Sequence, residues 1–363
     1  MNQCPKYGIP NMTVTKTIGT LCIRADADAS MGIGHVMRCL ALAQAWQDRG
    51  GRVFFISTMK TVSLLERLRQ ENMELIAITA TPGSEADLNQ TVAAAHAQKA
   101  AWIVLDGYHF TREFILSAQQ AGLHLLLLDD VADRDLSGVE AVLNQNAYAT
   151  EAMHQHFAPC PELLLGAPYT LIRREFLRPS CAKQIRAEAG RVLITLGGAD
   201  VPNATLKVMR ALQHITFRRL EVRLVIGAAN RHIDTLQTEM VALLEFHEAE
   251  FLINPPNIPE LMSWSDVTIT AAGSSCWELC CLGVPQLILV TADNQRLMPT
   301  YFIEHDIAEV FGELDDTRTE ELAQRLAALL LDTPRRMQLS RTALSGIDGG
   351  GAQRVLDFML SHS

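Results

Sequence analysis

Short, nearly continuous apolar runs alternate with longer amphipathic segments along most of this chain. Such runs are typical of strands in sheets that are buried on both faces, whereas half-exposed strands alternate apolar and polar residues. Repeated strand–helix units of this kind predict parallel sheets with helices on both faces. In the first half the predicted strands are residues 21–24, 53–56, 75–78, 102–105, 123–128 and 141–143, and the predicted helices are 36–47, 61–69, 85–98 and 112–121.

The alternation breaks at residues 166–180, which show no clear period, and restarts in the second half of the chain. A length of 363 residues also suits two domains. We therefore expect an α/β chain of two Rossmann-like domains facing each other across a cleft. In one possible arrangement, the last helix packs back on the N-terminal domain. The expected parts are a tail over 1–19, an N-terminal domain over 20–170, a linker over 171–190, a C-terminal domain over 191–345 and a C-terminal helix over 346–363.

Composition excludes several classes of protein. The 41 acidic and 31 basic residues give a net charge of −10, which provides no electrostatic attraction to nucleic acid or an anionic membrane. No apolar run reaches the roughly 20 residues that span a bilayer. The eight cysteines lack zinc-type CxxC spacing, and residues 1–20 are polar, so we expect buried, reduced thiols in a cytoplasmic protein. We expect Cys276, Cys280 and Cys281 on one helix, and His154 and His156 on the surface.

A loop rich in small residues follows the first predicted strand and runs from Arg24 to His35. Gly32 and Gly34 permit a close backbone approach to a ligand. His35 would lie in the first turn of the following helix, where free N–H groups favour anions and a neutral imidazole, which can act as a general base. A plain tight turn before a helix is the structural alternative. The loop lacks the third glycine of a dinucleotide fingerprint, and no acid ends the second strand, which argues against a NAD-dependent oxidoreductase.

A second candidate site is the turn T-A-A-G-S-S-C-W-E, which runs from a strand into a helix. Gly273, Ser274 and Ser275 can offer donors to a diphosphate at the helix N-terminus. Glu278 follows about one turn later and can accept from ribose hydroxyls. The alternative is a capping box between Ser275 and Glu278. The turn has no lysine of the Walker type, so it does not indicate an ATPase.

Polar residues follow several other predicted strands. Gly198 lies in the loop after strand 192–195, and Asn294 and Gln295 follow strand 286–290, so all three are candidates for ligand contact or ordinary turn residues. Asp106 and Tyr108 follow strand 102–105.

Asp129 and Asp130 follow strand 123–128. The adjacent aspartates are compatible with a divalent cation, but no third carboxylate lies nearby in the sequence, and solvated loop acids fit equally well.

Six segments follow one another along the chain: IRADADASMGIGHVMRCLALA, LDGYHF, LLGAPYTLIRREF, LGGADVPNATLK, AAGSSCWELCCLGVP and DNQ. In this order they resemble the PseG family, the UDP-2,4-diacetamido-2,4,6-trideoxy-β-L-altropyranose hydrolases of pseudaminic acid biosynthesis. The resemblance runs from about residue 21 to GGGAQRV at 349–355. This family is similar to the MurG-type glycosyltransferases, which implies a GT-B fold with a sugar-binding N-terminal domain and a UDP-binding C-terminal domain.

The resemblance implies that water replaces UDP at the anomeric carbon of the sugar. It assigns activation or positioning of that water to His35. It implies neither a metal nor a cofactor, because helix N-termini can stabilise the leaving diphosphate. The implied substrate-binding residues are Gly34 and Gly198 near the phosphates, Gly273, Ser274 and Ser275 around the diphosphate, Glu278 at the ribose, and Asp106, Tyr108, Asn294 and Gln295 near the sugar or water.

Cys276, the Cys280–Cys281 pair, Asp26 and Asp28 depart from the family pattern, and they leave the exact sugar open. The anomeric outcome and the oligomeric state are also left open. The alternatives are a MurG-like glycosyltransferase, a hydrolysing UDP-N-acetylglucosamine 2-epimerase, and a UDP-sugar-binding protein without activity. The scattered basic residues of the first domain favour a soluble substrate over a membrane-bound one.

Overall fold

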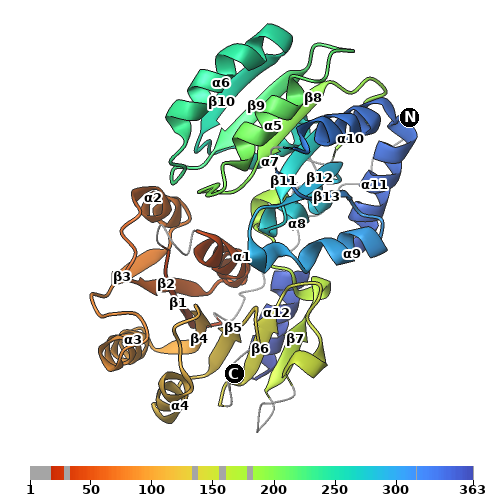
Figure 1. Ribbon diagram of the computed structural model, residues 1–363. Helices are drawn as coiled ribbons and strands as arrows, with labels where there is room; N and C mark the ends of the chain where they lie inside the picture. The colour runs from red at the N-terminus through yellow and green to blue at the C-terminus, as the bar shows by residue number, and fades with distance from the viewer. Residues whose placement is uncertain are drawn as a thin grey trace, which may run out of the picture.

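The computed structural model describes residues 18–27, 33–132, 138–154, 161–177, 183–315 and 317–362. These residues form two parallel sheets, with strand orders β3-β2-β1-β4-β5-β6-β7 and β10-β9-β8-β11-β12-β13. Figure 1 shows one sheet in each half of the molecule, and each sheet is flanked by helices. The predicted α/β fold with two Rossmann-like domains is therefore confirmed.

The strands of the N-terminal sheet agree with the predicted runs, except that β7 was not predicted. This four-residue edge strand pairs only with β6 among the described residues, and its short sequence ELLL directly precedes the break in the pattern. The N-terminal elements are β1 (Thr20–Ala25), α1 (Gly34–Asp48), β2 (Arg52–Ser57), α2 (Val62–Gln70), β3 (Glu74–Ala77), α3 (Glu85–Ala97), β4 (Ala100–Asp106), α4 (Arg112–Gln120), β5 (Leu125–Leu128), β6 (Ala141–Asn144), η1 (Glu151–His154), β7 (Glu162–Leu165), η2 (Ala167–Tyr169) and η3 (Arg174–Phe176).

The C-terminal sheet repeats the arrangement with six strands. Its elements are β8 (Arg191–Thr195), α5 (Ala204–Leu212), β9 (Glu221–Ile226), α6 (Ile233–Phe246), β10 (Glu248–Ile253), α7 (Ile258–Trp264), β11 (Val267–Ala271), α8 (Ser274–Leu282), β12 (Gln286–Val290), η5 (Asp293–Gln295), α9 (Met298–Glu304), β13 (Glu309–Glu313), α10 (Thr319–Leu331) and α11 (Thr333–Gly346), followed by α12 (Gly351–Ser361).

The strand order fixes where a ligand can meet both sheets. In the N-terminal sheet the chain runs outward from β1 to β3 and then returns to place β4 beside β1. In the C-terminal sheet β11 returns in the same way beside β8. Loops leave such a switch point in opposite directions and open a crevice at the carboxyl ends of the strands, where ligands of open α/β sheets bind.

The last helix, α12, packs on the N-terminal domain, although the chain reaches it from the C-terminal one (Figure 1). Val355, Leu356 and Met359 are buried in the same cluster as the apolar face of α1. The indole of Trp102 donates a hydrogen bond to the Met359 carbonyl oxygen over 3.0 Å. A side chain at Gly351 would overlap the backbone of Thr170, so the start of α12 needs glycine.

The five described cysteines are free thiols, and four of them are buried, as predicted. Cys276, Cys280 and Cys281 lie together on α8, also as predicted. Burial raises the pKa of Cys276 to about 12, so this thiol stays protonated at neutral pH. The expectation of a surface His154 is wrong, because the side chain is fully buried at the end of η1; His156 lies outside the described residues.

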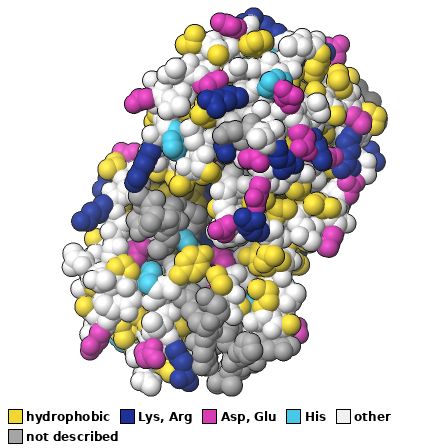
Figure 2. Space-filling model, in the orientation of Figure 1, with side chains coloured by type: hydrophobic (Ala, Val, Ile, Leu, Met, Phe, Trp, Pro, Cys, Tyr) yellow, Lys and Arg dark blue, Asp and Glu magenta, His cyan; other side chains and the backbone are white. Residues whose placement is uncertain are grey.

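Acidic and basic side chains are interspersed on the face of the molecule shown in Figure 2. In the described part of the chain, no helix is long and apolar enough to cross a membrane.

Candidate active site

The imidazole of His35 meets a buried carboxylate at the switch point of the N-terminal sheet. His35 lies in the first turn of α1, as predicted, and Asp106 is the last residue of β4. Nδ1 of His35 lies 2.5 Å from Oδ1 of Asp106. The side chain of Asp106 is fully buried and that of His35 is 9% exposed, so solvent competes little for this contact.

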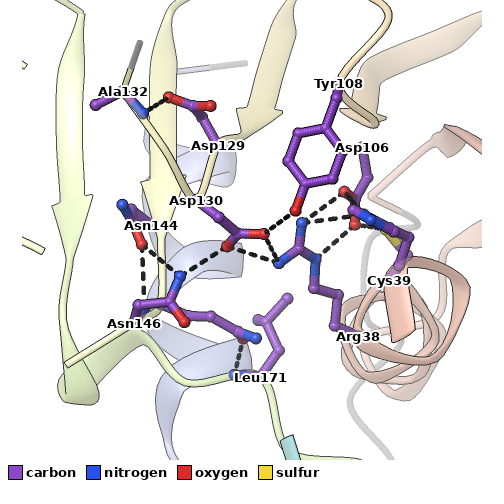
Figure 3. A network of polar contacts seen from close by, with 12 residues as sticks. Arg38, Cys39, Asp106, Tyr108, Asp129, Asp130, Ala132, Asn144, Asn146 and Leu171 are labelled. Carbon is purple, nitrogen blue, oxygen red and sulfur yellow. Dashed lines mark hydrogen bonds and ion pairs between the residues drawn. The ribbon is translucent and has the colours of Figure 1, made fainter. Parts of the chain in front are cut away.

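A guanidinium on the same helix completes the cluster. Arg38 donates to both oxygens of Asp106, from Nε to Oδ2 over 2.7 Å and from Nη2 to Oδ1 over 2.6 Å. Its Nη1 donates to both oxygens of Asp130 over 2.8 Å. Figure 3 shows this guanidinium between the two carboxylates, which come from the ends of β4 and β5.

Charge pairing controls the protonation of Asp106. Burial alone raises the pKa of this carboxyl group, but the Arg38 guanidinium and the hydrogen bonds from Arg38 and His35 outweigh burial and hold the pKa well below its usual range. Asp106 is therefore an ionised, acceptor-only group at neutral pH. The buried thiol of Cys39 also donates to its Oδ2, over 3.3 Å.

Tyr108 stands beside this cluster, about half exposed. Its ring meets the His35 imidazole edge-on, with centroids 5.2 Å apart and planes at 85°. Its hydroxyl donates to Asp130 Oδ2 over 3.3 Å, and the Asn146 amide donates to Asp130 Oδ1 over 2.8 Å (Figure 3). Burial and the charge of Asp130 raise the pKa of Tyr108 to about 12, so its phenol stays protonated.

Asp129 and Asp130 are engaged within the protein and are not solvated loop acids. Asp129 is buried and accepts a hydrogen bond from the Ala132 amide over 2.9 Å, whereas Asp130 pairs with Arg38. Over the described ranges, no group of three or more His, Cys, Asp or Glu residues is placed to hold a metal ion.

The glycine loop of the C-terminal domain faces the start of α1. A side chain at Gly198 would come within 3.9 Å of the Ile33 side chain, one residue before Gly34. Two of the predicted phosphate-approach positions, Gly34 and Gly198, are thus close together across the domain boundary. Gly32 lies outside the described residues.

The start of α8 forms the other predicted part of the site. Gly273 is the N-cap residue, and Ser274, which is exposed, and Ser275, which is partly buried, open the helix. A Cβ at Gly273 would meet no atom within 4 Å among the described residues, so a ligand can approach this backbone. The alternative of a Ser275–Glu278 capping box is wrong, because Gly273 is the N-cap and Glu278 pairs elsewhere.

Glu278 pairs with a linker residue that the sequence analysis did not single out. Arg173 donates to Glu278 Oε1 from Nη2 over 2.7 Å and from Nε over 3.0 Å. Burial raises the pKa of Glu278, and the charge of Arg173 offsets part of this effect. Arg173 also lies 3.2 Å from Glu175, which pairs with Arg67 of α2, so the predicted ribose carboxylate is linked through ion pairs to the N-terminal domain.

Asn294 and Gln295 lie in η5, after β12. Asn294 is exposed. The side-chain oxygen of Gln295 accepts from the backbone amide and the hydroxyl of Thr291, over 2.9 and 3.1 Å, so its NH₂ group is the part that can reach a ligand.

Sequence reasoning missed Arg38 and Arg173. Arg38 had a usable signal, because residues three apart lie on one face of a helix and Arg38 follows His35 at that spacing. Arg173 had none, since its partner lies 105 residues further along the chain.

Known proteins with similar sequences align with most of the chain. Residues 191–350 match the glycosyltransferase family 28 C-terminal domain. The spore coat polysaccharide biosynthesis protein SpsG of Bacillus subtilis is 21% identical over 92% of this chain and 95% of its own length. The UDP-2,4-diacetamido-2,4,6-trideoxy-β-L-altropyranose hydrolase of Campylobacter jejuni is 24% identical over 77% of this chain and 94% of its own.

An uncharacterized protein of Methanocaldococcus jannaschii is 22% identical over 76% of this chain, which spans only 56% of that protein.

Solved structures share the architecture at low identity. HepE of Anabaena, in complex with UDP-glucose, superposes with a TM-score of 0.66 at 14% identity over 94% of this chain and 99% of its own. MurG of Acinetobacter baumannii gives a TM-score of 0.62 at 16% identity, again over 94% and 99%. The protein therefore has the GT-B fold.

Proposed function

We propose that the protein hydrolyses a UDP-sugar, with UDP-2,4-diacetamido-2,4,6-trideoxy-β-L-altrose as the substrate, and releases UDP and the free sugar. The observation that carries the proposal is the hydrogen-bonded contact between His35 and the buried Asp106 at the switch point of the N-terminal sheet. A carboxylate that orients a histidine is the usual support of a general base. The similarity to the Campylobacter jejuni enzyme supports this choice of substrate.

His35 acts as the base in this scheme. Because Asp106 is ionised and can only accept, the Nδ1 atom of His35 carries the proton and Nε2 keeps a lone pair. Nε2 takes a proton from water as the water oxygen bonds to the anomeric carbon. The bond between that carbon and the diphosphate oxygen breaks, and its electron pair leaves with UDP. The proton on the imidazole then returns to solvent.

Tyr108 orients the same water. Its own hydroxyl proton points to Asp130, so toward a ligand its oxygen serves as an acceptor. A water that gives one hydrogen to His35 Nε2 and the other to Tyr108 presents a lone pair to the sugar. The edge-on packing of the two rings keeps both groups on one side of the site.

The C-terminal domain holds the nucleotide. The free amides at the start of α8, with Ser274 and Ser275, bind the diphosphate and stabilise its charge as it leaves. Glu278, presented by Arg173, accepts from the ribose hydroxyls. Gly34 and Gly198 let both loops approach the phosphates, and the amides of Asn294 and Gln295 face the sugar.

Transfer of the sugar to an acceptor other than water is the second candidate function. The match of residues 191–350 to the glycosyltransferase family 28 C-terminal domain favours it, as does the length of the alignment with SpsG. In that case His35 would take the proton from an acceptor hydroxyl, and the same residues would hold the donor.

A metal-free assay of UDP release separates these functions. The purified chain is offered UDP-2,4-diacetamido-2,4,6-trideoxy-β-L-altrose, UDP-N-acetylglucosamine and UDP-glucose in separate reactions. Rapid release of UDP and free sugar from the first substrate alone is the expected result. Release from UDP-N-acetylglucosamine with inversion at C2 would favour the epimerase, and UDP binding without release would favour a transferase or a binding protein.

A further inference from the structure

Arg38 is the cation shared by two carboxylates of the candidate active site. It forms two parallel hydrogen bonds with Asp106, of 2.6 and 2.7 Å, and a forked pair of 2.8 Å with Asp130. Its side chain is 10% exposed, against 0% for Asp106 and 18% for Asp130. Such bidentate pairs fix geometry as well as charge. Two of its three nitrogens thus face the carboxylate that contacts His35.

The contacts of His35 Nδ1 permit two arrangements of protons. In one, Nδ1 donates to ionised Asp106 over 2.5 Å. In the other, Asp106 is protonated, and Nδ1 accepts a hydrogen bond, either from the Asp106 carboxyl group or from Arg38 Nη2, which lies 3.2 Å away. The first arrangement leaves Nε2 as a base, whereas the second leaves Nε2 protonated and unable to accept a proton. Two charge-assisted contacts from Arg38 to Asp106 favour the first.

We infer that Arg38 is a positioning residue that fixes the tautomer of His35, by keeping Asp106 an acceptor-only group, and that Asp130 is the anchor that orients Arg38 for this task. The consequence for turnover rests on the proposed role of His35 as base. The tautomer itself is a property of the ligand-free protein and can be measured without any substrate.

Asp130 suits the anchoring role because its own position is held from two further elements. The Asn146 amide donates to it over 2.8 Å from the segment after β6, and the Tyr108 hydroxyl over 3.3 Å from the segment after β4. Asp130 engages only Nη1 of Arg38, so the opposite edge of the guanidinium, Nε and Nη2, is turned to Asp106 (Figure 3). The water-orienting tyrosine and the base are therefore linked through one guanidinium.

The charges around His35 explain why Arg38 is needed. The groups that face the imidazole are Asp106 from β4, Arg38 from α1 itself and Tyr108 from the loop after β4, with Asp130 behind Arg38. Removing the guanidinium leaves two carboxylates with no cation between them, one fully buried. A buried, unpaired carboxylate takes up a proton because its charged form is poorly solvated. Protonated Asp106 can then donate to Nδ1, and the second arrangement becomes populated.

Nitrogen NMR of the ligand-free full-length chain, labelled with ¹⁵N-histidine, tests the inference. The His35 signals are identified by their loss in His35→Asn. We expect the wild type to carry the proton on Nδ1 near neutral pH, and Arg38→Gln to shift toward the Nε2–H form. Arg38→Lys and Asp130→Asn should lie between the two. Arg49→Gln, at the exposed end of α1, is the matched control and should resemble the wild type.

Two results would overturn the inference: a wild-type His35 with its proton on Nε2, or an Arg38→Gln protein with the wild-type tautomer. If Arg38→Gln does not fold, as judged by circular dichroism, Asp130→Asn and Arg38→Lys provide the test instead. Each of them must then have a smaller Nδ1–H population than the wild type.

Kinetics provide an independent readout. With the substrate released by the wild type, Arg38→Gln should lower kcat by about 10²-fold or more, as expected for lost tautomer control of a catalytic histidine, with little change in UDP affinity. Arg38→Lys should restore part of the rate. A wild type that turns over no UDP-sugar but shows the expected tautomer would refute the proposed function and leave this inference standing.

Discussion

His35 and Asp106 lie 71 residues apart in the chain, yet Nδ1 and Oδ1 of the two side chains are 2.5 Å from each other. The pairing of β1 with β4 brings them together, because α1 follows β1 and Asp106 ends β4. The contact therefore lies at the point where the strand order of the N-terminal sheet reverses. Ile33, two residues before His35, lies beside Gly198 of the other domain.

Replacing His35 should separate chemistry from binding. His35→Asn is expected to lower turnover by about 10²–10⁴-fold, the usual contribution of a general base. UDP affinity should stay within a factor of about two, because the proposed nucleotide contacts, apart from the Gly34 backbone, come from the C-terminal domain. Steady-state UDP release and calorimetric titration with UDP measure the two effects. His96→Asn, on the exposed face of α3, is the control. Retained turnover would remove His35 from the role of base.

Glu278 and Arg173 should act as one unit in nucleotide binding. Glu278→Ala is expected to weaken UDP binding by about tenfold or more, since hydrogen bonds to charged groups contribute about 1.5–3 kcal/mol. Arg173→Met should also weaken it, because Glu278 then lies buried without its cation. The double variant should lose less than the sum of the two. Titration with UDP measures the cycle, with exposed Glu304→Ala as control. Full additivity would contradict the shared role.

The ion pair of Asp106 predicts a dependence of stability on acid pH. The pKa of this group is lower in the folded state than in the unfolded chain, so its contribution is fully present above the unfolded value of about 3.9 and is lost as pH falls toward the folded value. The difference in Tm between the wild type and Asp106→Asn should therefore shrink from pH 6 to pH 3. Exposed Asp357→Asn should show no such trend. A Tm difference that stays constant over this pH range would argue against the ion pair between Asp106 and Arg38.

Packing of α12 on the N-terminal domain predicts which half of the molecule a core deletion weakens. Leu356→Ala removes a fully buried side chain and should cost about 2–5 kcal/mol. Hydrogen exchange should speed up in β1 and α1, which share its core, before it does so in β8 and α8. Asp357→Ala, on the exposed side of α12, should leave exchange in both domains unchanged. Faster exchange confined to the C-terminal sheet would contradict this packing.

More of the fold than of the candidate site could be predicted from the sequence. Buried strands have continuous apolar sequences, which is why six of the seven strands of the N-terminal sheet lie on or near predicted positions and only the edge strand β7 was not predicted. His35 and Tyr108 were predicted because they follow strands at the carboxyl edge of a parallel sheet. The pairings of Arg38 with Asp130 and of Arg173 with Glu278 were not, because they depend on three-dimensional packing between distant segments.

The sequence-based predictions also failed where polar residues are buried. His154 reads as a surface histidine and the Asp129–Asp130 pair as solvated acids, yet His154 and Asp129 are buried. A polar residue is buried when the tertiary structure offers it a partner, and local sequence does not encode that partner.

Hydrolysis in ¹⁸O-labelled water tests the central claim most directly. The protein and the substrate that it turns over are incubated in H₂¹⁸O, and UDP and sugar are analysed at once by mass spectrometry. Attack of water at the anomeric carbon, assisted by His35, predicts unlabelled UDP and ¹⁸O in the sugar during the earliest turnovers. Label in UDP, and none in the sugar, would show that water attacks phosphorus instead and would contradict the account.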